Sequence, residues 1–247
     1  AILDLVGLKG YGERKPHELS GGQQQRVQLA RSLVLDRDIL LLDEPLAALD
    51  AQLRKDMCLE LKHLQEKVGI TFIHVTHNQE EAMTVGDRIA LIADGDLVEQ
   101  GSTRQVYEQP VSRFTAEFIG ENNLFNGAIK SFTKMKAAVD TNVGTISVDL
   151  QGAEVKVGDK VAVSMRSELL EMVAAPAAQS RAAKNSLLGT FTETVYLGLT
   201  TSYRIRLDDG AEINVRAISD EKVPTVPEHG ARVRVTWKPS TPRLHLS

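Results

Sequence analysis

The stretch Leu19-Ser20-Gly21-Gly22-Gln23-Gln24-Gln25-Arg26 decides how the sequence is interpreted. Ser20, with Gln23 three residues later, forms a capping box, which predicts that a helix begins directly after Ser20. The two glycines let an anion approach the backbone, and the positive end of the helix lies behind them with free N–H groups. The string therefore predicts an anion site made of Ser20, Gly21, Gly22 and Gln23. A capped helix after a glycine turn, without a ligand, is the favoured interpretation when the string is taken alone.

An apolar run, Ile39-Leu40-Leu41-Leu42, follows and ends in Asp43-Glu44-Pro45. A short continuous apolar run predicts a strand that is covered on both faces of a sheet. Ligands of α/β proteins bind at the carboxyl ends of such strands, so Asp43 is predicted to hold Mg²⁺. Glu44 is then placed to orient or deprotonate an attacking water. Two solvated acids at a strand end are the alternative, and the glycine-containing string before them argues against it.

Two further polar residues follow at element ends. Asp50 predicts the cap of a second helix, and Gly69 predicts its end. The apolar segment 70–75 predicts another buried strand, which is followed by His77. A histidine there can donate a hydrogen bond to a γ-phosphate or contact the attacking water. A lone histidine at a strand end is usually structural, but the order and spacing of these motifs favour the functional role.

The periodicity of the sequence changes near Gly120. Residues 1–119 alternate helical and apolar strand patterns, which predicts an α/β layer with largely parallel strands and an Asp94-Gly95 hairpin near its end. Short alternating segments separated by turn signals then predict a small all-β barrel or sandwich. The expected domains are 1–120 and 121–247, with a loop over the Ala-rich residues 174–183. The strands expected in the second domain are 136–140, 145–150, 160–165, 202–207, 212–217 and 232–237.

Taken together, these segments resemble the ATP-binding subunits of ABC transporters, in the importer subfamily that carries a C-terminal TOBE barrel. The residues that match are Ser20, Gly21 and Gly22 for the signature motif, Asp43 and Glu44 for Walker B, Asp50 for the D-loop and His77 for the switch.

Four other strings support the resemblance. Asn78-Gln79-Glu80-Glu81-Ala82-Met83 and Val98-Glu99-Gln100-Gly101-Ser102 are typical of importers for polyamines, sugars and ferric iron. Val195-Tyr196-Leu197-Gly198 and Val235-Thr236-Trp237-Lys238-Pro239 are similar to strand motifs of the TOBE barrel. The general pattern is most similar to spermidine/putrescine-type ATPases.

The resemblance implies a truncated P-loop-type ATPase fold followed by an OB-like barrel, and it implies ATP and Mg²⁺ as ligands. Two subunits are expected to form a homodimer that holds two ATP molecules head to tail. Ser20, Gly21, Gly22, Gln23 and Asp50 are the expected nucleotide-binding residues, and the signature residues among them face ATP bound by the partner. Asp43, Glu44 and His77 serve ATP on their own chain. Transmembrane permease subunits and, indirectly, a solute-binding protein are the implied partners, at the cytoplasmic face of the bacterial inner membrane.

One part of the ATPase pattern does not occur in this sequence. No Gly-x-x-x-x-Gly-Lys-Ser/Thr string is found, so the loop that cradles phosphates and its lysine are absent. In the resembled family this loop lies upstream, and the chain begins with Ala1-Ile2 inside a helical pattern, so we expect the start to be a truncation. We therefore expect the chain alone to be inactive as an ATPase. Ala47 and Asn78 replace a common Ser and Asp, which are mild departures.

Composition and charge exclude several other classes. The chain is 42% hydrophobic and 25% charged, with a formal net charge of −4. No apolar run reaches the ~18–20 residues that cross a bilayer, and the acidic balance argues against nucleic-acid binding. An ABC-type ATPase of DNA repair or translation needs long heptad arms or a basic surface, which the sequence lacks. A C-terminal regulatory, dimerisation or ligand-sensing module remains the alternative, and the single Cys58 excludes an internal disulfide.

Overall fold

The computed structural model describes residues 2–35, 37–47, 49–175, 184–219 and 227–246. The chain divides into two compact units, and each is described by itself. The first unit consists of Ala1–Ala90 with Gln100–Arg104, and the second consists of Leu91–Glu99 with Gln105–Ser247. This division does not locate the boundary between family domains, so the boundary near residue 120 stays a prediction.

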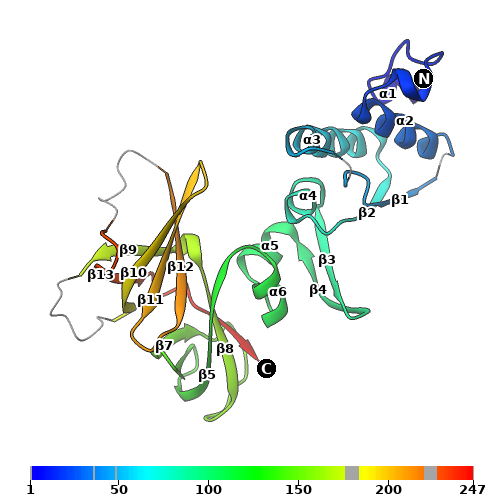
Figure 1. The fold of residues 1–247 in the computed structure, drawn as a ribbon. Helices are drawn as coiled ribbons and strands as arrows, with labels where there is room; N and C mark the ends of the chain where they lie inside the picture. Colours follow the sequence, from blue (N-terminus) through cyan, green and yellow to red (C-terminus); the bar gives the residue numbers. More distant parts are fainter. Residues whose placement is uncertain (1, 36, 48, 176–183, 220–226, 247) are drawn as a thin grey trace. The chain divides into compact units, whose positions relative to one another are not determined.

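The first unit has the α/β arrangement that the sequence predicts (Figure 1). Strands β1 and β2 pair in parallel, with Leu40 opposite Phe72. Buried residues of the helices and of β1 form one hydrophobic core. The elements are α1 (Ile2–Leu5), a 3-10 turn η1 (Pro16–Glu18), α2 (Gly21–Leu33), β1 (Ile39–Asp43), α3 (Ala51–Val68), β2 (Thr71–Val75) and α4 (Gln79–Val85).

The predicted helix ends are confirmed. Ser20 and Asp50 occupy the predicted N-cap positions, and their side chains accept hydrogen bonds from backbone N–H groups of the first turn. Asn78 caps α4 in the same way. Gly69 ends α3 with φ 73°, a left-handed conformation that glycine adopts without steric cost. Among the described residues no helix is both long and apolar enough to span a membrane.

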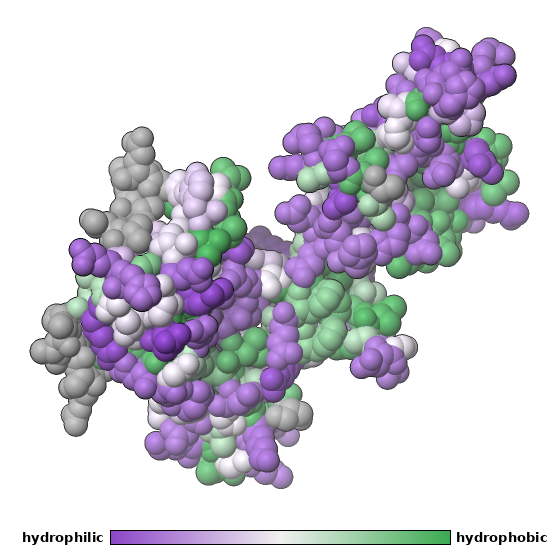
Figure 2. Space-filling model, in the orientation of Figure 1, coloured by the Kyte–Doolittle hydropathy of each residue, from purple (hydrophilic) through white to green (hydrophobic). Residues whose placement is uncertain are grey.

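The prediction that β1 is covered on both faces is wrong for the residues described. Leu40 and Leu42 are buried, whereas Ile39 and Leu41 are 58% and 65% exposed. The outward side chains of β2 are also open to solvent, and green apolar surface appears over these strands in Figure 2. Alternate residues of a strand point to opposite faces, and the described helices cover only one face of this two-stranded sheet.

The segment after α4 contains the predicted hairpin. Strand β3 (Arg88–Ala93) pairs with β4 (Asp96–Ser102), and the turn residues Asp94 and Gly95 both have positive φ, 52° and 88°. Positive φ at both residues is typical of the two-residue turns that connect the strands of a β-hairpin. Helices α5 (Thr103–Glu108) and α6 (Arg113–Phe118) follow.

The second unit contains two five-stranded sheets that share one hydrophobic core, which confirms the predicted all-β architecture. The order in one sheet is β14-β8-β5-β6-β7, and in the other it is β12-β11-β10-β13-β9. Four strands that the sequence analysis did not predict are β5 (Asn122–Phe132), β9 (Leu170–Ala174), β10 (Ser186–Tyr196) and β14 (Arg243–Leu246). The others are β6 (Lys136–Thr141), β7 (Gly144–Asp149), β8 (Lys160–Arg166), β11 (Thr200–Leu207), β12 (Glu212–Ile218) and β13 (Arg232–Trp237), with a 3-10 turn η2 (Ser167–Leu169) after β8.

The predicted loop over residues 174–183 lies mostly outside the described residues, because residues 176–183 are not described. Ala174 itself is the last residue of β9.

A buried amide connects the two sheets. Asn123 of β5 accepts a hydrogen bond from the Asn214 backbone N–H at 2.7 Å and donates to the Asn214 carbonyl oxygen at 2.9 Å. It also donates to the Met165 carbonyl oxygen at 3.3 Å. The side chain therefore pairs with the backbone of β12 as a neighbouring strand does, and it satisfies polar groups that are costly to bury unpaired.

We expect Asn123→Ala to lower the free energy of unfolding of the chain by about 1–3 kcal/mol, because it leaves half-buried backbone groups of Asn214 without these partners. Chemical denaturation followed by fluorescence or circular dichroism measures the change. Asn142→Ala is the matched control, since the Asn142 side chain is bonded at the surface to Asp209. An equal loss in both variants would contradict the assigned role of Asn123.

Candidate functional site

The start of α2 is the place at which the sequence predicts an anion site. Ser20 Oγ accepts from the Gln23 N–H at 3.3 Å, and the Gln23 side chain accepts from the Ser20 N–H at 3.0 Å. Gly21 is exposed, and a Cβ added to it would meet no atom within 4 Å. Gly22 is buried against Leu53, which an added Cβ would meet at 3.4 Å. Gly21 is therefore the position at which a ligand can reach the backbone beside the positive helix end.

Gln25 connects this helix to the segment after β1. Its side-chain amide donates to the carbonyl oxygen of Pro45, which directly follows Glu44. Gln24 fixes the segment that precedes α2, because its side-chain amide donates to the carbonyl oxygens of Pro16, at 2.8 Å, and of Leu19. The sequence alone indicated no role for Gln24 or Gln25. A glutamine in the sequence is only a weak signal of such a bridge, because a glutamine that points into solvent looks the same in the sequence.

Asp43 and Glu44 lie at the carboxyl end of β1, as predicted. The backbone of Glu44 has φ 45°, a left-handed conformation that costs a non-glycine residue free energy and recurs at functional sites. The Glu44 N–H donates to the Val75 carbonyl oxygen at 2.9 Å, so the strained residue is anchored to the neighbouring strand. Local strain at Glu44 therefore turns its side chain out of the strand at a fixed position.

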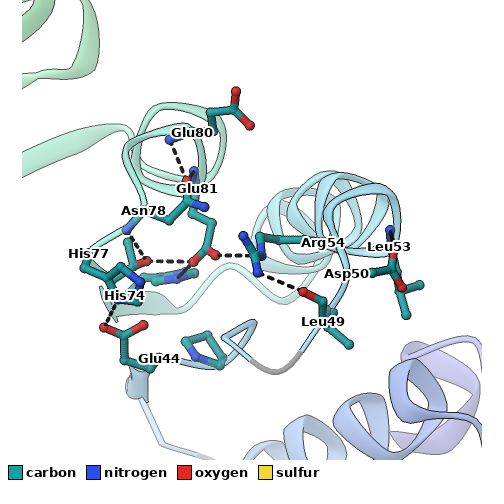
Figure 3. A network of polar contacts seen from close by, with 12 residues as sticks. Glu44, Leu49, Asp50, Leu53, Arg54, His74, His77, Asn78, Glu80 and Glu81 are labelled. Atoms are coloured by element: carbon teal, nitrogen blue, oxygen red, sulfur yellow. Dashed lines mark hydrogen bonds and ion pairs between the residues drawn. The ribbon is translucent and has the colours of Figure 1, made fainter. Parts of the chain in front are cut away.

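Glu44 and His77 contact each other. His77 Nδ1 lies 2.7 Å from Glu44 Oε1, and because a carboxylate only accepts, Nδ1 donates in this hydrogen bond (Figure 3). The parallel register places Asp43 opposite Val75, so the residues after both strands emerge at the same sheet edge. The His77 side chain is 79% exposed and that of Glu44 is 37% exposed, so a ligand can reach both. The sequence predicted the positions of these residues but not their hydrogen bond.

Asp50 is a cap rather than a partner of the other predicted residues. Its Oδ1 accepts from the Leu53 N–H at 3.0 Å, and the side chain is exposed at the start of α3. Ala48, in the segment that leads to Asp50, lies outside the described residues.

The predicted residues form two separate groups. Within the described parts of the chain, no hydrogen bond or ion pair joins the group Ser20, Gly21, Gly22 and Gln23 to the group Asp43, Glu44 and His77. The nucleotide-binding role of Asp50 stays a prediction.

Mg²⁺ fits Asp43 as a single hard-oxygen ligand. The Asp43 side chain is exposed at the strand end, with Glu44 next to it. No cluster of three or more His, Cys, Asp or Glu residues that can hold a metal ion occurs in the part of the chain that the structure describes. Mg²⁺ is commonly bound by one or two carboxylates together with substrate phosphates, rather than by an all-protein cage. A site completed by a bound phosphate group is therefore compatible with these residues.

A buried ionic cluster beside His77 was not predicted. Glu81 of α4 is 3% exposed and lies near His74 and Arg54 (Figure 3). It also accepts a hydrogen bond from the Thr76 hydroxyl group. The string Asn78–Met83 contains Glu81, but its sequence shows only an acidic first turn of a helix. Which of the two adjacent acids is buried depends on how α4 packs, and this is visible only in the structure.

Two family models match parts of the chain. The ABC transporter family matches residues 1–47, and the TOBE domain family matches residues 163–244. Among curated proteins, the spermidine/putrescine import ATP-binding protein PotA of Vibrio parahaemolyticus is 41% identical over 95% of this chain and 62% of its own length. PotA of Roseobacter denitrificans is 45% identical over 89% of this chain and 59% of its own length. The chain thus spans about six tenths of the length of these relatives.

A solved structure also aligns with part of the chain. The cytoplasmic molybdate-binding protein ModG covers 52% of this chain at 17% identity with a TM-score of 0.44, a likeness too loose to bear on fold or ligand. The family matches are more specific, and they fall on the segments that carry the signature string, the Asp43-Glu44 pair and the later β-strands. Residues 1–47 are therefore similar to part of the ABC transporter family, and residues 163–244 are similar to the TOBE domain family.

Proposed function

We propose that this chain is part of an ATP-binding subunit that couples ATP hydrolysis to solute import by an ABC transporter. In this proposal residues 1–120 belong to the ATPase domain, and residues 121–247 form the regulatory TOBE-like barrel. The observation that supports it most is the 2.7 Å contact between Glu44 and His77 at the ends of two neighbouring parallel strands. This is the edge of an α/β sheet at which ligands bind.

The hydrolytic step uses the residues at this edge. Glu44 orients the attacking water and accepts its proton, and the hydrogen bond from His77 fixes one carboxylate oxygen during the approach. The exposed ring of His77 can turn toward the γ-phosphate of ATP. Asp43 holds Mg²⁺, which neutralises charge on the phosphate oxygens when it is bound.

The signature residues act on a different ATP molecule. Ser20, Gly21, Gly22 and Gln23 present a hydroxyl group and backbone N–H groups at the start of α2, and they make no bond to Glu44 or His77 within the described residues. This separation supports a homodimer in which the signature residues of one copy contact ATP held by the other. Asp50, which follows Glu44 and precedes His77 in the sequence, is assigned to the same dimer contact.

The implied partners follow from the relatives, which are named as spermidine/putrescine import ATP-binding proteins. We propose that two copies bind transmembrane permease subunits peripherally at the cytoplasmic face of the inner membrane, and that a solute-binding protein delivers a polyamine. Proteoliposomes with the complete transporter, ATP inside and labelled spermidine outside, test this proposal. Uptake should require internal ATP, and equal uptake without ATP would contradict it. Preferential uptake of a sugar or ferric iron would contradict the polyamine assignment alone.

The 247-residue chain alone should show no MgATP hydrolysis above the rate of a buffer blank, because its sequence contains no phosphate-cradling loop. Phosphate release measured at high protein concentration tests this expectation, with the complete subunit as the positive control. Turnover by the chain alone that disappears in its Glu44→Gln variant would show that the expectation is wrong.

The alternative, ligand sensing by residues 121–247, has less support. A pocket of about 180 Å³ is lined by Asn142, Leu187, Asp208, Asp209 and neighbouring apolar residues. Its acidic side chains already have partners, since Asp208 is paired with Arg232 and Asp209 accepts from Asn142. The ion pair with Arg232 also lowers the pKa of Asp208 below its ordinary value, mainly through the hydrogen bond. A polyamine would have to displace these contacts.

A further inference from the structure

A buried carboxylate, that of Glu81, connects three elements around the proposed hydrolytic residues (Figure 3). Its Oε2 accepts from Thr76 Oγ1 at 2.8 Å and lies 3.3 Å from His74 Nε2. Its Oε1 forms an ion pair with Arg54 Nε at 3.6 Å. The residue is 3% exposed, so both oxygens depend on protein groups rather than on water. A buried carboxylate is costly unless it is paired and hydrogen-bonded, as it is here.

One partner of Glu81 leads to the switch segment. The Thr76 hydroxyl group donates a hydrogen bond to Glu81, and Thr76 Oγ1 also accepts one from the Asn78 N–H at 3.0 Å. Thr76 and Asn78 flank His77, so the two bonds hold the backbone on both sides of the histidine. The Asn78 side chain accepts from the N–H groups of Glu80 and Glu81, which closes the connection to α4.

The other partner leads to the segment that enters α3. Arg54 pairs with Glu81 through Nε, and its Nη2 donates to the Leu49 carbonyl oxygen at 2.8 Å. Leu49 directly precedes Asp50, the predicted D-loop aspartate. The Glu81 carboxylate is therefore linked through Thr76 to the backbone beside His77, and through Arg54 to the backbone beside Asp50.

We propose that Glu81 is a positioning residue that fixes the switch segment and the Asp50 segment relative to each other, so that His77 meets Glu44 in the geometry that hydrolysis requires. The proposal rests on the proposed function. Buried ionic clusters contribute little net stability compared with well-packed apolar residues, so we assign the charge of Glu81 to positioning rather than to stability. The role we assign to the cluster around Glu81 is to fix the positions of Thr76 and Arg54.

The test uses the complete subunit and two pairs of variants. Glu81→Gln removes the charge at nearly constant shape, and Glu80→Gln is its control on the exposed side of the same helix. Thr76→Val removes the hydroxyl group between Glu81 and the His77 segment, and Thr76→Ser is its control because it keeps that hydroxyl group. The measurements are kcat and KM for MgATP, the ATP dissociation constant, and the thermal unfolding midpoint.

We expect Glu81→Gln and Thr76→Val to lower kcat roughly 10- to 100-fold while ATP affinity changes little, because misplacement of a catalytic group mainly affects the chemical step. Glu80→Gln and Thr76→Ser should keep the normal kcat. In a His77→Ala background, Glu81→Gln should add little further loss, because both changes act through the same group. A purely structural role would instead give losses that multiply in that background and that follow the unfolding midpoint.

The outcomes distinguish a failure of the positioning role of Glu81 from a failure of the proposed function. If Glu81→Gln does not fold, the Thr76→Val and Thr76→Ser pair decides by itself, and equal kcat values in that pair would overturn the positioning role. A normal kcat in Glu81→Gln would overturn it as well. If the complete subunit hydrolyses ATP and Glu44→Gln does not, only the role of Glu81 is in question. If the complete subunit does not hydrolyse ATP, the proposed function and this inference both fail.

Discussion

Replacement of Glu44 by glutamine in the complete subunit should slow MgATP hydrolysis by about 10²- to 10⁴-fold, which is the range that a positioned general base contributes. Glutamine has nearly the same shape and can still accept the hydrogen bond from His77 Nδ1 through its carbonyl oxygen. It cannot accept the proton of the attacking water. The strained backbone at φ 45° is retained, so the variant isolates the loss of basicity from a change of geometry.

Single-turnover phosphate release and equilibrium binding of a fluorescent ATP analogue measure the two quantities separately. ATP affinity should remain close to that of the unaltered subunit. Glu66→Gln, on the exposed side of α3, is the control for the removal of one acid. Hydrolysis by Glu44→Gln at the normal rate would exclude Glu44 as the base, and an equal loss in Glu66→Gln would point to a general charge effect.

Gly21→Asp should have opposite effects on stability and on activity. Nothing lies within 4 Å of an added Cβ, and Gly21 is the first residue of α2, where a carboxylate interacts favourably with the helix dipole. The substitution should therefore leave the unfolding midpoint unchanged or raise it slightly. The same carboxylate occupies the anion site and repels the phosphates of the partner's ATP. We expect a loss of hydrolysis of at least tenfold, because an uncompensated like charge beside a bound anion costs more than about 1.4 kcal/mol.

Steady-state hydrolysis and thermal unfolding of the same preparation test this prediction. Gly12→Asp is the matched control, since Gly12 is exposed and an added Cβ would meet Leu3 only at an ordinary 3.6 Å. Normal hydrolysis by Gly21→Asp would show that no phosphate approaches Gly21. Loss of activity together with a large drop in the unfolding midpoint would assign the effect to folding instead.

Local signals predicted the first unit well because capping depends on a few adjacent residues. Ser20, Asp50, Asn78 and Gly69 each act on the backbone within a few positions, so their sequence context determines their geometry. The burial of β1 depends on which elements cover the sheet, which no local pattern contains. The outward exposure of Leu41 was therefore missed.

The longest strands of the second unit were missed for a related reason. Gly127 of β5 and Gly189 of β10 weaken the strand pattern, although a Cβ at these positions would meet neighbouring backbone at 2.5 Å and a neighbouring side chain at 2.6 Å, respectively. Both strands also contain register shifts, between Ile129 and Ser131 and between Phe191 and Glu193, which break the alternation of apolar residues. Close packing between strands thus selects residues that look unfavourable for strands when the sequence is examined one segment at a time.

The candidate site was predicted as a set of positions rather than as a set of contacts. Motif order placed Glu44 and His77 at the ends of neighbouring strands, but the strained backbone of Glu44 and the bond to His77 arise from the pairing of β1 with β2. Glu81 has no sequence signal that distinguishes it from Glu80, because only the rotation of α4 decides which acid is buried.

Retention of ATP by the complete subunit after rapid desalting tests most directly whether two copies hold each nucleotide between Glu44 of one chain and the signature residues of the other. The Glu44→Gln subunit, incubated with labelled MgATP, should retain the nucleotide after unbound ATP is removed. The Glu44→Gln/Gly21→Asp double variant should release it, because the added carboxylate repels the phosphates of the partner's ATP. Equal retention by both variants would contradict the assignment of Gly21 to the partner's ATP, and with it the proposed ATP sandwich.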